Sequence, residues 1–320
     1  MSLSPVLCPK LYHAYLEGIA LKEPSHMWII LSLIAGLADA LRDAFSKQSS
    51  KTIPRSLITW SYSLFALPFF VPLALLHLPE TIPLDFWLLV TCAALLHVGG
   101  GLMLVKALHV SDLSVCTPMV AFTPVFLLVV GPLLTGDIPS TGGTIGALLV
   151  VAGSYILNIS KKSCGLLAPL KALYTDTGPR LMLALALLWS VTGSIDRIAV
   201  QRFPALFWAS VQLCAIAVFL IPVVIKSGAL TKNKSSLKAA NAPNVFRALL
   251  TLGAINCASF ATYLIALQLA PVHYVVCVKR SSIPFSILLG KMMFQEQDLR
   301  ERLPGGLLML AGVVIISLFG

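Results

Sequence analysis

The sequence predicts an all-α integral membrane protein, with ten transmembrane helices as two inverted five-helix repeats. Of the 320 residues, 58% are hydrophobic and 11% are charged, and the mean hydropathy is +0.90. Soluble domains contain about 45–50% apolar and about 25% charged residues, so this much apolar surface needs a bilayer to cover it. The apolar residues fall into stretches of about 20, the length that crosses the hydrocarbon core as a helix.

Ten such stretches follow one another along the chain. They lie at residues 27–47, 56–78, 84–107, 112–134, 141–160, 180–200, 203–226, 246–269, 272–294 and 303–319. Backbone in lipid must satisfy its own hydrogen bonds, so the stretches predict a helical bundle. Five spans per half is an odd number, and the halves therefore enter the membrane from opposite sides. We expect a leader (1–26), a first repeat (27–160), a connecting segment (161–179) and a second repeat (180–320).

The second half repeats the first in outline. The segment PVFLLVVG at 124–131 resembles PFSILLG at 284–290, about 160 residues later. The segment GALLVVAG at 146–153 resembles GGLLMLAG at 305–312. Internal repeats of this size in an apolar chain are typical of transporters.

The distribution of basic residues predicts the topology. Of the 23 Lys and Arg residues, about sixteen lie in connections after odd-numbered spans, and about four lie in the other connections and termini. The positive-inside rule then places the odd-numbered connections in the cytoplasm and both termini outside. We expect a multi-pass protein of the cell membrane, the inner or plasma membrane. The basic residues form no stripe with interleaved aromatics, which excludes a nucleic-acid partner.

Signatures of enzymes and metal sites are absent from the sequence. It contains no His-Glu-x-x-His helix, no Gly-x-Ser-x-Gly turn and no Walker A loop. The seven cysteines are scattered and form no CxxC pair, which indicates neither a disulfide framework nor a zinc site. We therefore predict that the protein is not an enzyme and has no cofactor and no metal.

The ninth stretch carries two cations far from its start. Lys279, Arg280 and Ser281 begin about eight residues into it, roughly 12 Å deep at 1.5 Å per residue. The repeat-equivalent positions, Met119 and Val120, are uncharged. Charged residues at this depth are expensive and are usually functional. One interpretation is that they hold an anionic group, such as a carboxylate or a phosphate. The other is that they neutralise acids on neighbouring helices and lock the bundle.

Two charge pairs occupy equivalent positions in the first and sixth stretches. Asp39 and Asp43 share one helix face, Arg42 stands beside them, and Arg42-Asp43 corresponds to Asp196-Arg197 with the order of charges reversed. An inverted repeat places the pairs near opposite membrane faces. One hypothesis is that each pair closes one end of a central pathway. Static interfacial ion pairing is the equally weighted alternative.

Prolines and single polar residues complete the candidate site. Pro124 and Pro284 would open the backbone hydrogen-bond ladder in mid-span, and broken helices often build transporter sites. A simple packing kink is the alternative for both. The further candidates for lining the cavity are Asn256, Tyr263, Gln212 and Trp189.

In their order and duplication, these motifs resemble those of the drug/metabolite transporter superfamily, specifically its EamA-type members. The resemblance covers roughly residues 27–319. It rests on an Ala-Leu pair and a mid-span proline in each half, an acidic residue after the span (Asp137 and Glu296) and a Gly-rich Leu-Leu-x-x-Ala-Gly segment. It implies alternating-access movement of small metabolites, driven by a gradient. Members of the family handle chemically diverse solutes, so the substrate does not follow.

The predicted function is secondary transport of a small metabolite bearing an anionic group, such as an amino acid, across the cytoplasmic membrane. Lys279 and Arg280 would bind the anionic group, and Asp39 or Asp43 would serve as a coupling or gating carboxylate. The expected partners are the solute, the lipid bilayer, and protons or a counter-substrate; monomer and homodimer both stay open. The alternative function is a flippase-like or lipid-modifying protein whose cations hold a phosphate head group.

Overall fold

The computed structural model describes residues 26–50, 53–76, 78–79, 81–111, 118–158, 168–226, 242–280, 282–285 and 299–319. Throughout these ranges the regular structure is helical, without a strand. The predicted leader lies outside them, apart from residue 26.

Twelve helices of eight residues or more are described in those ranges. They are α2 (Met27–Ser49), α3 (Arg55–Leu64), α4 (Leu67–Leu75), α5 (Leu84–Val110), α7 (Thr123–Thr135), α8 (Thr141–Asn158), α9 (Ala168–Thr175), α10 (Thr177–Arg202), α11 (Ala205–Lys226), α13 (Ala242–Leu269), α14 (Val272–Lys279) and α16 (Leu299–Phe319).

Every one of the ten predicted stretches contains helix, but within the described ranges six helical segments are both long and apolar enough to cross a membrane. These are Ser56–Leu75, Leu84–Leu104, Pro118–Thr135, Thr177–Arg202, Ala205–Lys226 and Pro243–Leu269. Two shorter apolar helices lie at Thr141–Leu157 and Pro304–Phe319. The chain is thus a multi-pass membrane protein, and the count of ten crossings stays a prediction. The structure also places α9 inside the predicted connection 161–179.

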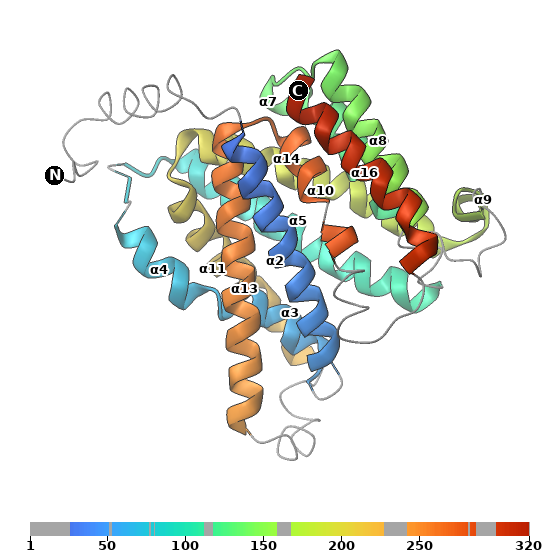
Figure 1. Ribbon diagram of the computed structural model, residues 1–320. Coiled ribbons are helices and arrows are strands. Elements are labelled where there is room, and N and C mark those ends of the chain that lie inside the picture. The colour runs from blue at the N-terminus through green and yellow to red at the C-terminus, as the bar shows by residue number, and fades with distance from the viewer. Residues whose placement is uncertain are drawn as a thin grey trace.

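The packing of α8 against α16, which lie side by side in Figure 1, follows the sequence repeat. A Cβ on Gly146 would lie 2.7 Å from the carbonyl oxygen of Gly312, and a Cβ on Gly153 would lie 2.5 Å from that of Gly305. Gly146 precedes Gly153 along α8, whereas its partner Gly312 follows Gly305 along α16, so the helices are antiparallel. Small residues allow this close backbone approach. Equivalent helices that meet in antiparallel fashion are what an inverted repeat requires.

Other helix contacts also come in equivalent pairs. The contact of α2 with α13 in one part of the bundle corresponds to that of α10 with α5 in the other. The contact of α2 with α14 corresponds to that of α10 with α7. Figure 1 shows α2 running beside α13 through the middle of the molecule. Each half thus contributes elements to both interfaces, and the two halves pack as one bundle.

Both helices that carry the mid-span prolines are interrupted. Residues 118–120 are helical, a turn follows at Ala121 and Phe122, and α7 begins at Thr123 with Pro124 in its first turn. In the second half α14 ends at Lys279, Arg280 caps it, and residues 282–285, including Pro284, are helical again. The prolines therefore lie just after the breaks, where a missing N–H costs least.

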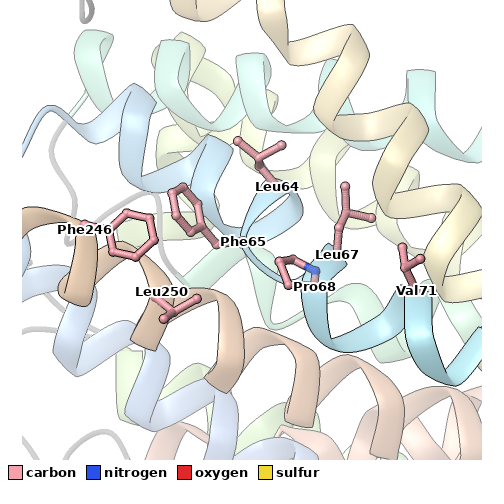
Figure 2. Close-up of a pocket in the computed structure, with 7 residues that line it drawn as sticks. All are labelled: Leu64, Phe65, Leu67, Pro68, Val71, Phe246 and Leu250. Atoms are coloured by element: carbon pink, nitrogen blue, oxygen red, sulfur yellow. The ribbon is translucent and has the colours of Figure 1, made fainter.

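The surface of the bundle carries many exposed large apolar side chains, as a lipid-facing surface does. Figure 2 shows one hollow of about 540 Å³ in this surface, between α3, α4 and the first turns of α13. Its lining is entirely apolar: Leu64, Phe65, Leu67, Pro68, Val71, Phe246 and Leu250. It can receive an apolar group, and none of its lining residues offers a charge.

Candidate functional site

The centre of the bundle holds an ionic cluster that joins the two halves. Asp39 on α2 forms ion pairs with Arg42 on the same helix (2.9 Å) and with Lys279 on α14 (3.1 Å). The hydroxyl of Ser259 on α13 donates to the same carboxylate at 2.6 Å. Asp39 and Lys279 come from different repeats, so this ion pair crosses the interface between them. It matches the interpretation in which Lys279 neutralises an acid on a neighbouring helix.

Arg42 extends the cluster toward α3. Its guanidinium lies 3.2 Å from the carboxylate of Asp43, donates to the amide oxygen of Asn256 at 3.1 Å, and stacks 5.2 Å from the ring centre of Tyr62. The amide nitrogen of Asn256 in turn donates to the backbone carbonyl of Tyr62. Each donor of this group has an acceptor, as buried polar networks require.

Lys279 makes a second contact that fixes its position. Its ammonium lies 4.4 Å from the ring centre of Tyr263, a cation–π interaction. Tyr263 is buried, stacks on Phe260, and its hydroxyl would lie 3.3 Å from a Cβ placed on Gly193 of α10. Tyr263 thus connects the cluster at α2 and α14 with the middle of α10.

Arg280 differs from its neighbour in having no carboxylate partner among the described residues. One terminal nitrogen donates to the backbone carbonyl of Val120 at 3.3 Å. Its Nε is buried and has no hydrogen-bond partner. Val120 precedes the break before α7, and Arg280 forms the break after α14, so the two interruptions face each other. A partly buried cation whose buried Nε has no acceptor, placed at two helix breaks, is able to receive an anion.

A second ion pair joins the halves at another level of the bundle. Arg197 on α10 lies 3.1 Å from Asp137, which follows α7, and its guanidinium also donates to the backbone carbonyl of Leu267. The exposed fractions of the two side chains are 10% and 20%. Eight residues of α13 separate Leu267 from Ser259, which places the two ion pairs about 12 Å apart along that helix.

Asp196 and Arg197, predicted to act as one pair, have separate partners. Asp196 is buried, and one of its oxygens accepts from the indole N–H of Trp208 (3.0 Å) and from the amide of Gln212 (2.9 Å). The partner of Arg197 is Asp137. Because adjacent helix positions project about 100° apart, Asp196 faces α11 while Arg197 faces α7 and α13. The gate hypothesis for Asp196-Arg197 stays a prediction, and the ion pair that Arg197 forms is with Asp137.

The remaining predicted residues divide by position. Trp189 lies on α10 where Gly100 of α5 packs against it, outside the ionic cluster. Ser281 lies outside the described residues.

The ionic clusters also contain three residues that were not selected for the site from the sequence: Tyr62, Ser259 and Asp137. Asp137 was selected from the sequence only as a family-like feature. No pattern in the sequence indicates that it pairs with Arg197 on α10. Among the described residues, no group of three His, Cys, Asp or Glu could hold a metal ion.

The chain is thus a membrane bundle of apolar helices in two repeats, with partly buried ion pairs between the repeats. The family model of the EamA-like transporter family matches residues 26–159 and 177–318, and the chain belongs to this family. Its members are membrane transporters of small molecules.

Among solved structures, one crystal structure is similar with a TM-score of 0.69 and 17% sequence identity. The match covers 92% of this chain and 96% of the other. At this identity the similarity concerns the fold alone. A search of curated proteins finds no match.

Proposed function

We propose that the protein carries a small solute bearing an anionic group across the cell membrane, through a pathway between its two repeats. Arg280 is the group that recognises the anion. The observation that supports this role is its state in the bundle: a buried Nε without a partner, one hydrogen bond to a backbone carbonyl, and no ion pair with an acid among the described residues. A carboxylate or phosphate oxygen would supply the missing acceptor, and charged hydrogen bonds of this kind are strong.

The balance of charge around Lys279 supports the same assignment. The central cluster contains the cations Arg42, Lys279 and Arg280 but only two acids, Asp39 and Asp43. Among the described residues of this cluster, the cations therefore exceed the acids by one. An uncompensated charge in a medium of low polarity is costly. An anionic solute that enters this region supplies the compensating negative charge and is bound there.

Alternating access is supported by the two ion pairs that cross between the repeats. Asp39–Lys279 and Asp137–Arg197 lie at different depths, and each joins one residue of the first repeat to one of the second. Rocking of one repeat against the other would break one pair while the other holds. Ion pairs of this type cost little to exchange when water enters on the open side.

A thermal-shift panel tests the anion site. The purified full-length protein is heated with single solutes, including amino acids, organic phosphates, sugars and neutral analogues. A ligand that binds only the folded protein raises the melting temperature by mass action, by about 2.7 kcal/mol of stability at a hundredfold excess over its Kd. We expect an anionic solute to stabilise the wild type and to lose this effect in Arg280→Met.

Arg180→Met is the matched control, because Arg180 lies at an exposed position at the start of α10 and donates to the carbonyls of Leu173 and Tyr174 at the end of α9. It should respond to the solute like the wild type. An equal shift in Arg280→Met and wild type would refute the anion site. Stabilisation by phospholipid head groups alone would instead favour the lipid-handling alternative, for which the apolar hollow of Figure 2 offers no cation.

A further inference from the structure

We propose that Asp196 is the site that binds and releases a coupling proton during transport. This inference rests on the proposed transport function and deepens it by naming the coupling ion. Asp196 is 2% exposed and lies on α10 within the bundle. Its described partners are two neutral donors, the indole of Trp208 and the amide of Gln212, both on the same oxygen. In the part of the chain that the structure describes, no cation forms an ion pair with it.

The sequence analysis assigned coupling to Asp39 or Asp43, and the geometry favours Asp196 over both. Asp39 has two cations within 3.1 Å, and Asp43 lies 3.2 Å from Arg42 and is largely exposed. A carboxylate held by cations stays ionised, because the cations stabilise its charged form. Asp196 lacks such partners, and a buried acid without them is neutralised at the lowest cost by taking up a proton.

Comparison of the two repeats explains why Asp196 has no ionic partner. Its equivalent in the first repeat is Arg42, which is compensated by Asp39 and Asp43 and hydrogen-bonded by Asn256. The equivalents of those partners around Asp196 are uncharged or already engaged. Gly193 stands in place of Asp39, His97 in place of Asn256, and Arg197, in place of Asp43, is held by Asp137. The second repeat thus buries one charge and omits its counter-charges.

The groups that face Asp196 leave it able to change its charge. On α11 both contacts are neutral donors, and the amide oxygen of Gln212 is buried without a hydrogen-bond partner. Helix α13 contributes the hydroxyl of Tyr263, and α14 contributes the ammonium of Lys279, which interacts electrostatically with Asp196. Helix α5, which packs against α10, carries His97; this residue interacts electrostatically with Lys279 rather than with Asp196, and its buried Nε2 has no hydrogen-bond partner.

Breaking the Asp39–Lys279 pair would link protonation to movement. Lys279 acts on Asp39 directly at 3.1 Å and on Asp196 from further away. When the repeats rock and Lys279 leaves Asp39, its positive charge can stabilise the ionised form of Asp196, so the protonated carboxyl of Asp196 releases its proton. When the pair re-forms, Asp196 takes a proton up again from the side that is open. A proton needs no cavity, which fits the close packing of Trp208 on this carboxylate.

Infrared difference spectroscopy of the purified full-length protein tests this site without any solute. The probe is the C=O stretching band of a protonated carboxyl group in the bundle interior, followed from mildly acidic to alkaline pH. We expect the wild type to show this band at low pH and to lose it as the pH rises. Asp196→Asn should lack the band at every pH. Asp137→Asn is the matched control and should keep it, because the band does not come from that residue.

The following results would contradict the proposal. A band of equal size in Asp196→Asn, or its absence from the wild type at every pH, would overturn it. Sodium that raises the melting temperature of the wild type but not of Asp196→Asn would assign the site to a metal cation instead. If Asp196→Asn fails to fold, Asp196→Glu replaces it, and the band should then shift in frequency. Because no solute is present, this outcome is independent of the Arg280 thermal-shift result.

Discussion

Arg280 and Val120 form a hydrogen bond of 3.3 Å and stand 160 positions apart in the sequence, which is the spacing of the internal repeat. They are equivalent residues of the two repeats, so their contact marks the place where the repeats meet about their common axis. The carbonyl of Val120 lies at a helix break and also accepts from the hydroxyl of Thr123 at 2.8 Å. At the same place the second repeat carries a cation. A charge on the axis is close to both repeats whichever way they rock.

Removal of the Arg280 charge should not weaken the empty protein. Arg280→Met deletes a partly buried cation that forms no ion pair among the described residues. Replacing buried ionic groups by apolar side chains is often neutral or stabilising by about 1–4 kcal/mol. We expect the melting temperature without solute to be unchanged or higher than that of the wild type. Thermal unfolding followed by circular dichroism measures this. A lower melting temperature would mean that Arg280 serves the bundle rather than a ligand.

The fold followed from the sequence because membrane helices are specified by local composition. The length and apolarity of each stretch predicted where helix would lie, and the duplicated glycines of 146–153 and 305–312 predicted which helices would correspond. What they could not predict was the helix boundary inside 56–78, where α3 and α4 are separate, or the short helix α9 within a polar connection. Such ends depend on tertiary contacts rather than on the apolar pattern.

Several residues of the ionic clusters could be selected from the sequence, but their pairings could not, and their roles in a site stay predictions. The depth of Lys279 and Arg280 in their span was enough to select them, because a charge at that depth is energetically costly and is usually functional. Which acid each cation meets depends on how helices from different repeats rotate against each other, and a single sequence carries no record of that rotation. Asp196 and Arg197 show the consequence, because neighbours in the sequence face different helices. Asp137 shows the converse, since its partner lies 60 residues away.

The Asp39–Lys279 ion pair should respond unequally to removal of its two members. Asp39→Asn leaves Lys279 without a carboxylate in the part of the bundle described, and uncompensated buried charges typically cost about 3–5 kcal/mol. Lys279→Met should cost less, because Asp39 keeps Arg42 and the hydroxyl of Ser259. Thermal unfolding of both variants and of the double variant gives the coupling energy. Equal losses with no coupling would show that the pair does not hold the repeats together.

The glycines of α16 provide a matched pair for the contact between repeats. A Cβ on Gly305 would lie 2.8 Å from the carbonyl oxygen of Gly153, whereas one on Gly306 would have nothing within 4 Å. Gly305→Ala should therefore destabilise the protein by about 1–3 kcal/mol through overpacking. Gly306→Ala should be neutral or stabilising by up to about 1 kcal/mol, because alanine favours the helix. Similar melting temperatures for the two variants would contradict the antiparallel packing of α8 on α16.

The Asp137–Arg197 ion pair should control transport, while an exposed pair near the end of the same helix should not. Asp137→Asn removes one partner of a largely buried pair, and a lost charged hydrogen bond is worth about 1.5–3 kcal/mol. A difference of that size changes the population of the closed state by about tenfold or more. We expect transport of the stabilising solute into liposomes to fall accordingly, with the protein still folded.

The control is Asp85→Asn, which breaks the pair of Asp85 with Arg202, 3.4 Å apart and more than half exposed on both sides. Solvent-exposed pairs contribute about 0–1 kcal/mol, so this variant should transport at the wild-type rate. If Asp137→Asn also transports at that rate, the pair is a static link between the repeats and the gate lies elsewhere. If both variants lose transport together, the effect belongs to the surface charge of this end of α10 rather than to the closure between α7, α10 and α13.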